Sequence, residues 1–321
     1  MESALASDMS KAERARPRAT FAHHLEYWAL RATATILRPF GWRAASRAGA
    51  FIGGLIWRPL GIRADRVQRA IAAAFPEFSE ARVREVARAS YHGLGTMAFE
   101  TIILSRLGRD ELIAAFAEPD GWPLLDAAAK KGQGVVIVAG HMGNWELCAA
   151  YMAARGLPLD VITMHMANPL ADRFLRRTRE RLGARVVFDD EAVRVTPRAL
   201  KEGRAVGFMS DQGAKGLAST FVDFFGRPAK TPRGAAVFAL RGERPMIFVA
   251  AIREADGRYR FHAQEVPLAT GGEREQNVDD TVRNYTRVIE EYVRRYPEQY
   301  FWQHRRWRRQ PADTPAHLRE P

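Results

Sequence analysis

The sequence predicts an α/β protein with a mostly parallel central sheet flanked by helices and with amphipathic helices at its N-terminal end. Between residues 134 and 265, short β-branched apolar runs alternate with longer helical patterns. This alternation is typical of parallel strands joined by right-handed helical crossovers. With 321 residues, 47% of them hydrophobic, the chain is long enough to bury a substantial core.

The chain divides into four predicted segments. Residues 1–20 are polar, charged and alanine-rich, which predicts a flexible tail, and they do not have the layout of a secretory signal. Residues 21–66 are expected to form a helical membrane-associating segment. Residues 67–310 are expected to form one large domain, and residues 311–321 a C-terminal tail.

The helices expected over residues 21–57 mix aromatic, aliphatic and arginine side chains. Their longest uninterrupted apolar run, Ala48–Trp57, is half of the roughly 20 residues that a membrane-spanning helix needs. The composition is typical of a helix lying in a membrane interface. The alternative is that these helices only pack against the rest of the protein.

The remaining elements follow from local periodicity and from glycine, proline and capping residues. Strands are expected at 135–139, 159–163, 184–188, 205–209, 246–252 and 259–265. Helices are expected at 63–99 with a break at 75–79, at 101–116, 122–131, 146–155, 170–182, 193–202, 235–240 and 278–296. Ser79 is expected to cap the helix that follows the break.

Polar residues follow the first predicted strand directly, namely His141, Asn144 and Glu146. Strand ends in open α/β sheets usually carry the ligand site. Side chains five positions apart on one helix point about 140° from each other. His141 and Glu146 therefore meet only if His141 lies in the turn before a helix that Asn144 caps, with Glu146 in its first turns.

In that arrangement Glu146 would bond one ring nitrogen of His141 and leave the other free to take a proton. The plainer alternatives are an ordinary turn histidine and a glutamate favoured by the helix dipole. Asp211 follows the strand predicted at 205–209. Because parallel strands end at the same edge of a sheet, His141 and Asp211 can share one cleft.

Other catalytic motifs are absent from the sequence. There is no Gly-x-Ser-x-Gly elbow, no His-Glu-x-x-His or paired-cysteine zinc set, and no Walker loop. Gly132-x-Gly134 precedes its strand, whereas a dinucleotide fingerprint follows one. The single cysteine, Cys148, excludes an intramolecular disulfide and fits a cytoplasmic setting. Its apolar helical context favours a buried structural thiol over a nucleophile.

The string His-Met-Gly-Asn-Trp-Glu at residues 141–146 resembles the His-x4-Asp/Glu motif of the glycerolipid-type acyltransferases. Within that group it is most similar to the late acyltransferases of bacterial lipid A assembly, the lauroyl and myristoyl transferases. The likeness continues in the same order over residues 67–307. It includes Ala74-Phe-Pro-Glu77, Asn168-Pro-Leu170 with the arginine-rich segment 173–181, Ser210-Asp-Gln212, Phe221–Gly226 with Pro228-Ala229, and Pro297–Trp307.

The resemblance implies that residues 67–310 move a fatty acyl chain from an acyl-carrier-protein thioester to a hydroxyl of a lipid A precursor, a phosphorylated glucosamine lipid. It implies that His141 is the general base, that Glu146 orients it, and that transfer is direct, with no cofactor and no metal. Substrate binding is expected of the residues that match the other motif positions: Arg179, Asp211, Asn144 and Asn168. The expected partners are acyl carrier protein, the lipid acceptor and the cytoplasmic face of the inner membrane, on which the protein would be peripheral or monotopic.

Two departures from the family concern the acceptor. His165 stands where the family commonly has an arginine, and Gln212-Gly213 replaces a longer charged loop of some members. Another membrane lipid, such as a mannosylated, ornithine or hopanoid-like acceptor, therefore remains an alternative. So does a non-catalytic, membrane-associated lipid-binding protein of the same fold. Arg179 could equally be a solvated helix arginine, and Asp211 a strand-end cap.

A formal charge of +12 predicts an anionic partner. The densest basic cluster is His304-Arg-Arg-Trp-Arg-Arg309. An anionic lipid or carrier protein is its first expected partner and a merely solvated surface the second. Nucleic acid, which arginines and a tryptophan can also bind, ranks last and is not expected.

Overall fold

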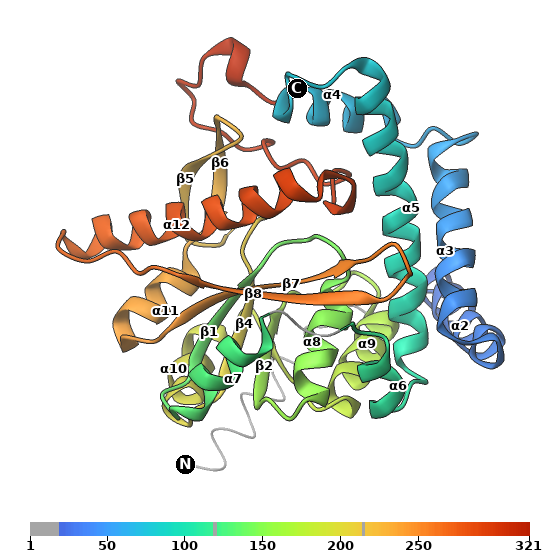
Figure 1. The fold of residues 1–321 in the computed structure, drawn as a ribbon, viewed down its shortest axis with the longest axis horizontal. Helices are drawn as coiled ribbons and strands as arrows, with labels where there is room; N and C mark the ends of the chain where they lie inside the picture. Colours follow the sequence, from blue (N-terminus) through green and yellow to red (C-terminus); the bar gives the residue numbers. More distant parts are fainter. Residues whose placement is uncertain (1–18, 118–120, 214–215) are drawn as a thin grey trace.

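A six-stranded sheet forms the centre of the computed structural model, which describes residues 19–117, 121–213 and 216–321 (Figure 1). The strand order is β3-β2-β4-β1-β7-β8, and only β8 runs antiparallel to its neighbour. The mostly parallel sheet is therefore confirmed. The strands are β1 (Val135–Ala139), β2 (Leu159–Thr163), β3 (Arg185–Phe188), β4 (Ala205–Met209), β7 (Met246–Arg253) and β8 (Tyr259–Val266).

Strand β4 lies between β1 and β2, so Ala205 pairs with both Val135 and Leu159. The register continues to the carboxyl ends of the strands, where Ala139 pairs with Met209. The segments that leave β1 and β4 therefore start side by side, which is the arrangement expected for His141 and Asp211.

Helices cover both faces of the sheet (Figure 1). One hydrophobic core lies under α10, α11 and α12, and the other under α7 and α8. Most predicted helices are confirmed, and Ser79 and Asn144 cap α5 and α8 as expected. The bounds are α4 (Ala64–Ala74), α5 (Glu80–Leu104), α7 (Trp122–Lys130), α8 (Trp145–Ala154), α9 (Pro169–Arg181), α10 (Ala192–Lys201), α11 (Gly234–Gly242) and α12 (Arg274–Arg295).

Two N-terminal helices, α2 (Phe21–Leu37) and α3 (Gly41–Trp57), flank the long helix α5, with a 3-10 turn at Arg38–Phe40 between them. Figure 1 shows α3 running alongside α5. A Cβ atom at Gly49 would lie 2.3 Å from the carbonyl oxygen of Gly95, so only glycine permits this close approach. None of the helices that the structure describes is both long and apolar enough to cross a bilayer.

A buried carboxylate joins these helices to the sheet. Glu100 of α5 is fully buried and accepts hydrogen bonds from Ser46 Oγ (2.5 Å), Asn144 Nδ2 (2.9 Å) and the Tyr259 hydroxyl (2.5 Å), and it pairs with Arg253. A buried charge needs such complete pairing, because an unpaired one costs several kcal/mol. Through Ser46, this carboxylate joins α3 to α5 and to the sheet.

The structure differs from the predicted elements at two places. The helix expected at 101–116 is interrupted, because α5 ends at Leu104 and α6 spans Arg109–Ala114. Gly108 begins the second helix, and its amide donates to the Glu111 carboxylate. Residues 219–232, which were not predicted as strands, form the hairpin β5 (Ser219–Phe224) and β6 (Arg227–Pro232).

Both ends of the described chain are held by hydrogen bonds. Of the tail expected at 1–20, residues 1–18 lie outside the described part, and Thr20 caps α2. Residues 311–321, expected to be a tail, contact the rest of the protein. Arg227 donates to the carbonyl oxygens of His317 and Arg319 at 2.9 Å, and Glu320 pairs with Arg305.

Candidate active site

His141 lies at the carboxyl end of β1 and is held by Asp211 from the end of β4. The Nδ1 atom of His141 is 2.7 Å from Asp211 Oδ1, and the His141 backbone amide donates to Asp211 Oδ2 at 3.0 Å. The histidine side chain is 20% exposed, and Asp211 is 1% exposed. One carboxylate thus fixes both the backbone and the ring of His141, and the second ring nitrogen is free for a substrate.

Aromatic side chains and backbone bonds fix the histidine further. Its ring is 5.0 Å from that of Trp145 in an edge-to-face arrangement, and the Phe301 amide donates to its carbonyl oxygen at 2.9 Å. Gly143 adopts a positive φ of 56°, and a Cβ atom there would lie 1.9 Å from the carbonyl oxygen of Ala251. The loop between β1 and α8 therefore requires glycine at this position.

The pairing of His141 with Glu146 that the sequence predicted is wrong. Glu146 lies in the first turn of α8, as expected, but both of its oxygens accept from Arg179 of α9, at 2.9 Å from Nε and 2.6 Å from Nη2. Within the described chain, the carboxylate bonded to His141 is that of Asp211. The predicted proximity of His141 and Asp211 is confirmed, but Asp211 is buried and does not itself line the cavity beside His141, although substrate binding was expected of it.

In each of these two pairs, the pKa of one group is shifted by the charge of its partner. Burial alone would raise the pKa of Asp211, but the charge of His141 and the hydrogen bonds it donates lower that pKa to about 2. Burial likewise opposes the charge of Arg179, and the facing Glu146 outweighs it, so the pKa of Arg179 is raised. Asp211 is thus ionised and Arg179 is cationic at neutral pH.

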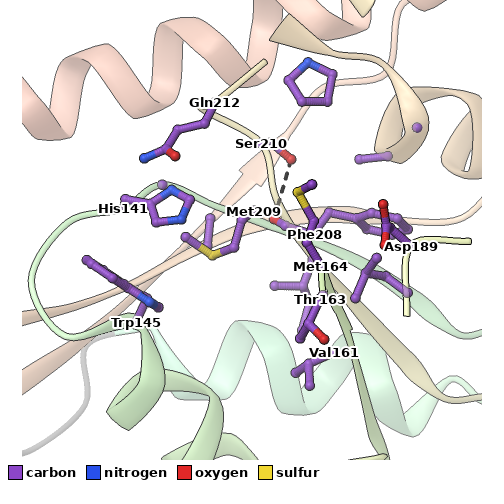
Figure 2. Close-up of a pocket in the computed structure, with 18 of the residues that line it drawn as sticks. His141, Trp145, Val161, Thr163, Met164, Asp189, Phe208, Met209, Ser210 and Gln212 are labelled. Carbon is purple, nitrogen blue, oxygen red and sulfur yellow. Dashed lines mark hydrogen bonds between the residues drawn. The ribbon is translucent and has the colours of Figure 1, made fainter. Parts of the chain in front are cut away.

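A cavity of about 720 Å³ opens beside His141. Its apolar part follows the sheet, where Gly207 pairs with Ile137 on one side and Val161 on the other, and it is closed by Ala149 and Met152 of α8. Figure 2 shows His141 and Trp145 on one side of this cavity and Asp189 across from them. The volume and the apolar lining suit a long apolar chain whose end is brought to His141.

The remaining predicted site residues fall into two groups, those that line the cavity and those that do not. Glu146 and Arg179 both line the cavity. Asn144 is fully buried, where it bonds the Leu147 amide and Glu100. Asn168 caps α9 and donates to Glu26 of α2 at 2.8 Å. The structure therefore places neither asparagine on the cavity, and both hold elements together.

Cys148 lines the cavity, whereas His165 does not. His165 stacks on Phe188 with ring centroids 3.7 Å apart and lies 3.4 Å from Asp172. Cys148 is buried, and burial raises the pKa of its thiol. The interpretation of Cys148 as a structural thiol is therefore consistent with its environment.

The C-terminal segment supplies a basic rim that the sequence did not place. His304, Arg305, Arg306, Arg308 and Arg309 line the cavity, together with Lys230 of β6. Burial lowers the pKa of His304 to about 4, so that its ring is neutral at pH 7. Among the described residues no group of three or more histidine, cysteine or acidic side chains is arranged to hold a metal ion.

The fold and site define a class of protein. An α/β sheet presents a histidine, oriented by a buried carboxylate, to a large, mostly apolar cavity, and this suits base-assisted transfer of an acyl group. Residues 16–309 match the family model described as bacterial lipid A biosynthesis acyltransferase, and the chain belongs to that family. It is an acyltransferase of the lipid A biosynthesis type.

Characterised relatives are similar over most of their length. The lipid A biosynthesis lauroyltransferase of Escherichia coli (strain K12) is 26% identical over 275 residues, which are 84% of this chain and 87% of the relative. The palmitoleoyltransferase of the same organism is 26% identical over 262 residues, 81% of this chain and 83% of the relative. A lipid A biosynthesis acyltransferase of Shigella flexneri has the same identity and coverage.

Proposed function

We propose that the protein transfers a fatty acyl chain from an acyl-carrier-protein thioester to a hydroxyl group of a phosphorylated glucosamine lipid, a precursor of lipid A. The observation that carries this proposal is the His141–Asp211 pair beside an apolar cavity of about 720 Å³. The family supports the reaction class, and the basic rim of the cavity suits anionic substrates.

His141 acts as the general base in the proposed mechanism. Its Nδ1 carries the proton donated to Asp211, which leaves Nε2 as the acceptor. Nε2 removes the proton of the acceptor hydroxyl as its oxygen attacks the thioester carbonyl. The tetrahedral intermediate collapses with cleavage of the carbon–sulfur bond, and the imidazolium returns the proton to the departing sulfur. The ester and the free thiol are the products, and no covalent enzyme intermediate is needed.

Arg179 supplies positive charge near the reaction. It lines the cavity, and Glu146 holds its guanidinium group through two hydrogen bonds. Negative charge develops on the carbonyl oxygen in the transition state, and a fixed cation in a partly dehydrated site stabilises it strongly. In this mechanism Glu146 acts on the arginine, while Asp211 acts on the base.

The protein is further proposed to lie peripherally on the cytoplasmic face of the inner membrane. Large apolar side chains of α2 are exposed to solvent, including Phe21 (85%), Leu25 (64%) and Trp28 (60%). Arg31 lies on the same helix and Arg38 follows it directly, and aromatic, aliphatic and basic side chains together favour the membrane interface. Asn168 ties this helix to the beginning of α9, the helix that carries Arg179 in its last turn.

The decisive test replaces the base. His141→Ala is expected to abolish acyl transfer in an assay with acyl-carrier-protein thioester and lipid A precursor, while circular dichroism and the melting temperature stay close to those of the wild type. Full activity of the folded variant would refute the mechanism. If the wild type transfers acyl chains only to a different membrane lipid, the chemistry stands and the acceptor assignment fails.

The membrane proposal has its own test. Replacing Phe21, Leu25 and Trp28 by serine should release the protein from vesicles that contain anionic lipid, measured by co-sedimentation. The control replaces Val193 and Phe221, which are 77% and 44% exposed on other elements. Equal loss of binding in both variants would show that α2 is not the contact surface.

A further inference from the structure

Three cationic side chains that line the cavity have no anionic partner among the described residues. Lys230 of β6 and Arg308 and Arg309 of the C-terminal segment all line the cavity. In the part of the chain that the structure describes, their side chains form no ion pair and no hydrogen bond. Arg305, beside them, differs because it is paired with Glu320.

A buried arginine holds the two segments that carry these cations together. Arg306 is 5% exposed, and it donates to the Lys230 carbonyl oxygen and to Thr231 Oγ1, both at 2.6 Å. The Gln310 amide donates to the Pro228 carbonyl oxygen at 3.1 Å. The backbones of β6 and of residues 306–310 are thus fixed against each other, so the three cations are carried by adjacent segments of the cavity lining.

The cationic group is also tied to the reacting histidine. The same C-terminal segment begins at Phe301, whose amide donates to the His141 carbonyl oxygen. The acidic side chains that line the cavity belong to other segments. Glu146 is paired with Arg179, Asp172 lies in α9 after β2, and Asp189 follows β3. Positive charge is therefore gathered on one part of the cavity lining.

Like charges on one part of a cavity lining repel one another, and an anion bound among them offsets the repulsion. Nη1 of Arg309 is buried without a hydrogen-bond partner among the described residues, so a donor is already dehydrated there. A phosphate monoester carries a charge of about −1.5 to −2 at pH 7 and three strong acceptor oxygens. Arginine and lysine form charge-assisted bonds with such a group that are shorter and stronger than neutral ones.

We propose that Lys230, Arg308 and Arg309 form a phosphate-binding site that takes a phosphate monoester of the lipid acceptor. This inference rests on the proposed function and adds the part of the acceptor that is recognised. Three cations match a dianionic monoester better than the single charge of a phosphodiester, such as one in the arm of a thioester donor. Binding there would anchor the headgroup while the acceptor hydroxyl reaches His141.

The test compares Lys230→Gln, Arg308→Gln and Arg309→Gln with Arg287→Gln in the full-length protein. Arg287 is an exposed arginine of α12 with no partner among the described residues, and it does not line the cavity. Each of the first three variants, called the rim variants below, is expected to raise the acceptor KM roughly tenfold, with kcat and the donor KM nearly unchanged. With an enzymatically dephosphorylated acceptor, wild type and rim variants should have the same KM.

Three outcomes would overturn the proposal. A rise in the donor KM on both acceptors would assign the cations to a donor phosphate. An equal effect of Arg287→Gln would show only a general effect of net charge. No effect of any rim variant would exclude the site.

A second readout does not depend on the acyltransferase reaction. Binding of glucosamine 1-phosphate, followed by ligand-observed NMR, should be weakened in the rim variants and unchanged in Arg287→Gln. Weakened binding by a protein without transferase activity would keep the phosphate site and reject the proposed reaction. Equal binding by all variants, with active wild type, would reject the site alone.

Discussion

His141 and Asp211 are 70 residues apart in the sequence, yet two hydrogen bonds join them, one from the ring and one from the backbone amide. The contact exists because β1 and β4 are neighbours in the sheet and end at the same level. The His-x4-Glu motif at 141–146 therefore does not contain the carboxylate that holds its histidine, and the strand order supplies that carboxylate.

Asp211→Asn should lower kcat by roughly 10²–10⁴-fold with a nearly unchanged acceptor KM. An amide can still bond the ring, but it neither stabilises the imidazolium nor enforces the tautomer with a free Nε2. Steady-state kinetics would measure the loss. Since the carboxylate is almost fully buried, the melting temperature of the variant must be measured as a control. A kcat above one tenth of the wild-type value would contradict the role of Asp211.

Glu146→Gln should destabilise the protein by roughly 2–4 kcal/mol, because Arg179 keeps its charge in a mostly buried place without its partner. The double variant Glu146→Gln/Arg179→Gln should recover much of that free energy of unfolding and still lack activity. Urea denaturation of the single and double variants measures the stability. Recovered activity in the double variant would show that Arg179 does not stabilise the transition state.

Gly207→Ala should shift the preferred acyl chain to a shorter one. A Cβ atom at Gly207 would lie 3.7 Å or more from its neighbours, so alanine fits the fold while it occupies space in the cavity. Each methylene that is no longer buried costs about 0.8 kcal/mol, or roughly fourfold in selectivity. Competition between thioesters of different chain length would reveal the shift. Gly93→Ala, in α5 and away from this cavity, should leave the selectivity unchanged.

Acidification should destabilise the protein through His304. The pKa of this buried ring is lowered from 6.5 to about 4, so the unfolded chain binds its proton at a higher pH than the folded one. The stability that the neutral ring contributes is complete above pH 6.5 and is lost as the pH falls towards 4. In His304→Gln, the melting temperature should fall less between pH 7 and pH 5 than in the wild type. An identical pH dependence would contradict this assignment.

The central sheet was predictable because its strands are short, buried and β-branched, with glycine or polar residues at their ends. The hairpin β5–β6 was not, because Pro228 and Pro232 lie in β6 and proline normally argues against a strand. The interruption at 105–108 was also missed, since the apolar pattern continues across it. The spacing of apolar residues indicates which side chains are buried in this segment, but it does not indicate that the helix is interrupted by a turn.

The site was predictable in part of its membership but not in its pairing. The motif marks His141 and Glu146, and the strand pattern correctly placed Asp211 close to His141. Which carboxylate bonds the ring depends on the direction of the Glu146 side chain, and that is set by Arg179 on another helix. Asn144 and Asn168 stand in family motifs and yet hold helix ends, so a motif position alone does not separate binding from architecture.

In the proposed mechanism, the bond between His141 and Asp211 makes the base depend on nearly the whole chain. A chain synthesised only as far as α8 contains the entire His-x4-Glu motif, but β4 and Asp211 are still to come. The Phe301 amide, which bonds the same histidine, follows 90 residues after Asp211. Truncated and nascent chains are therefore expected to be inactive, because the segments that orient the histidine are synthesised long after it.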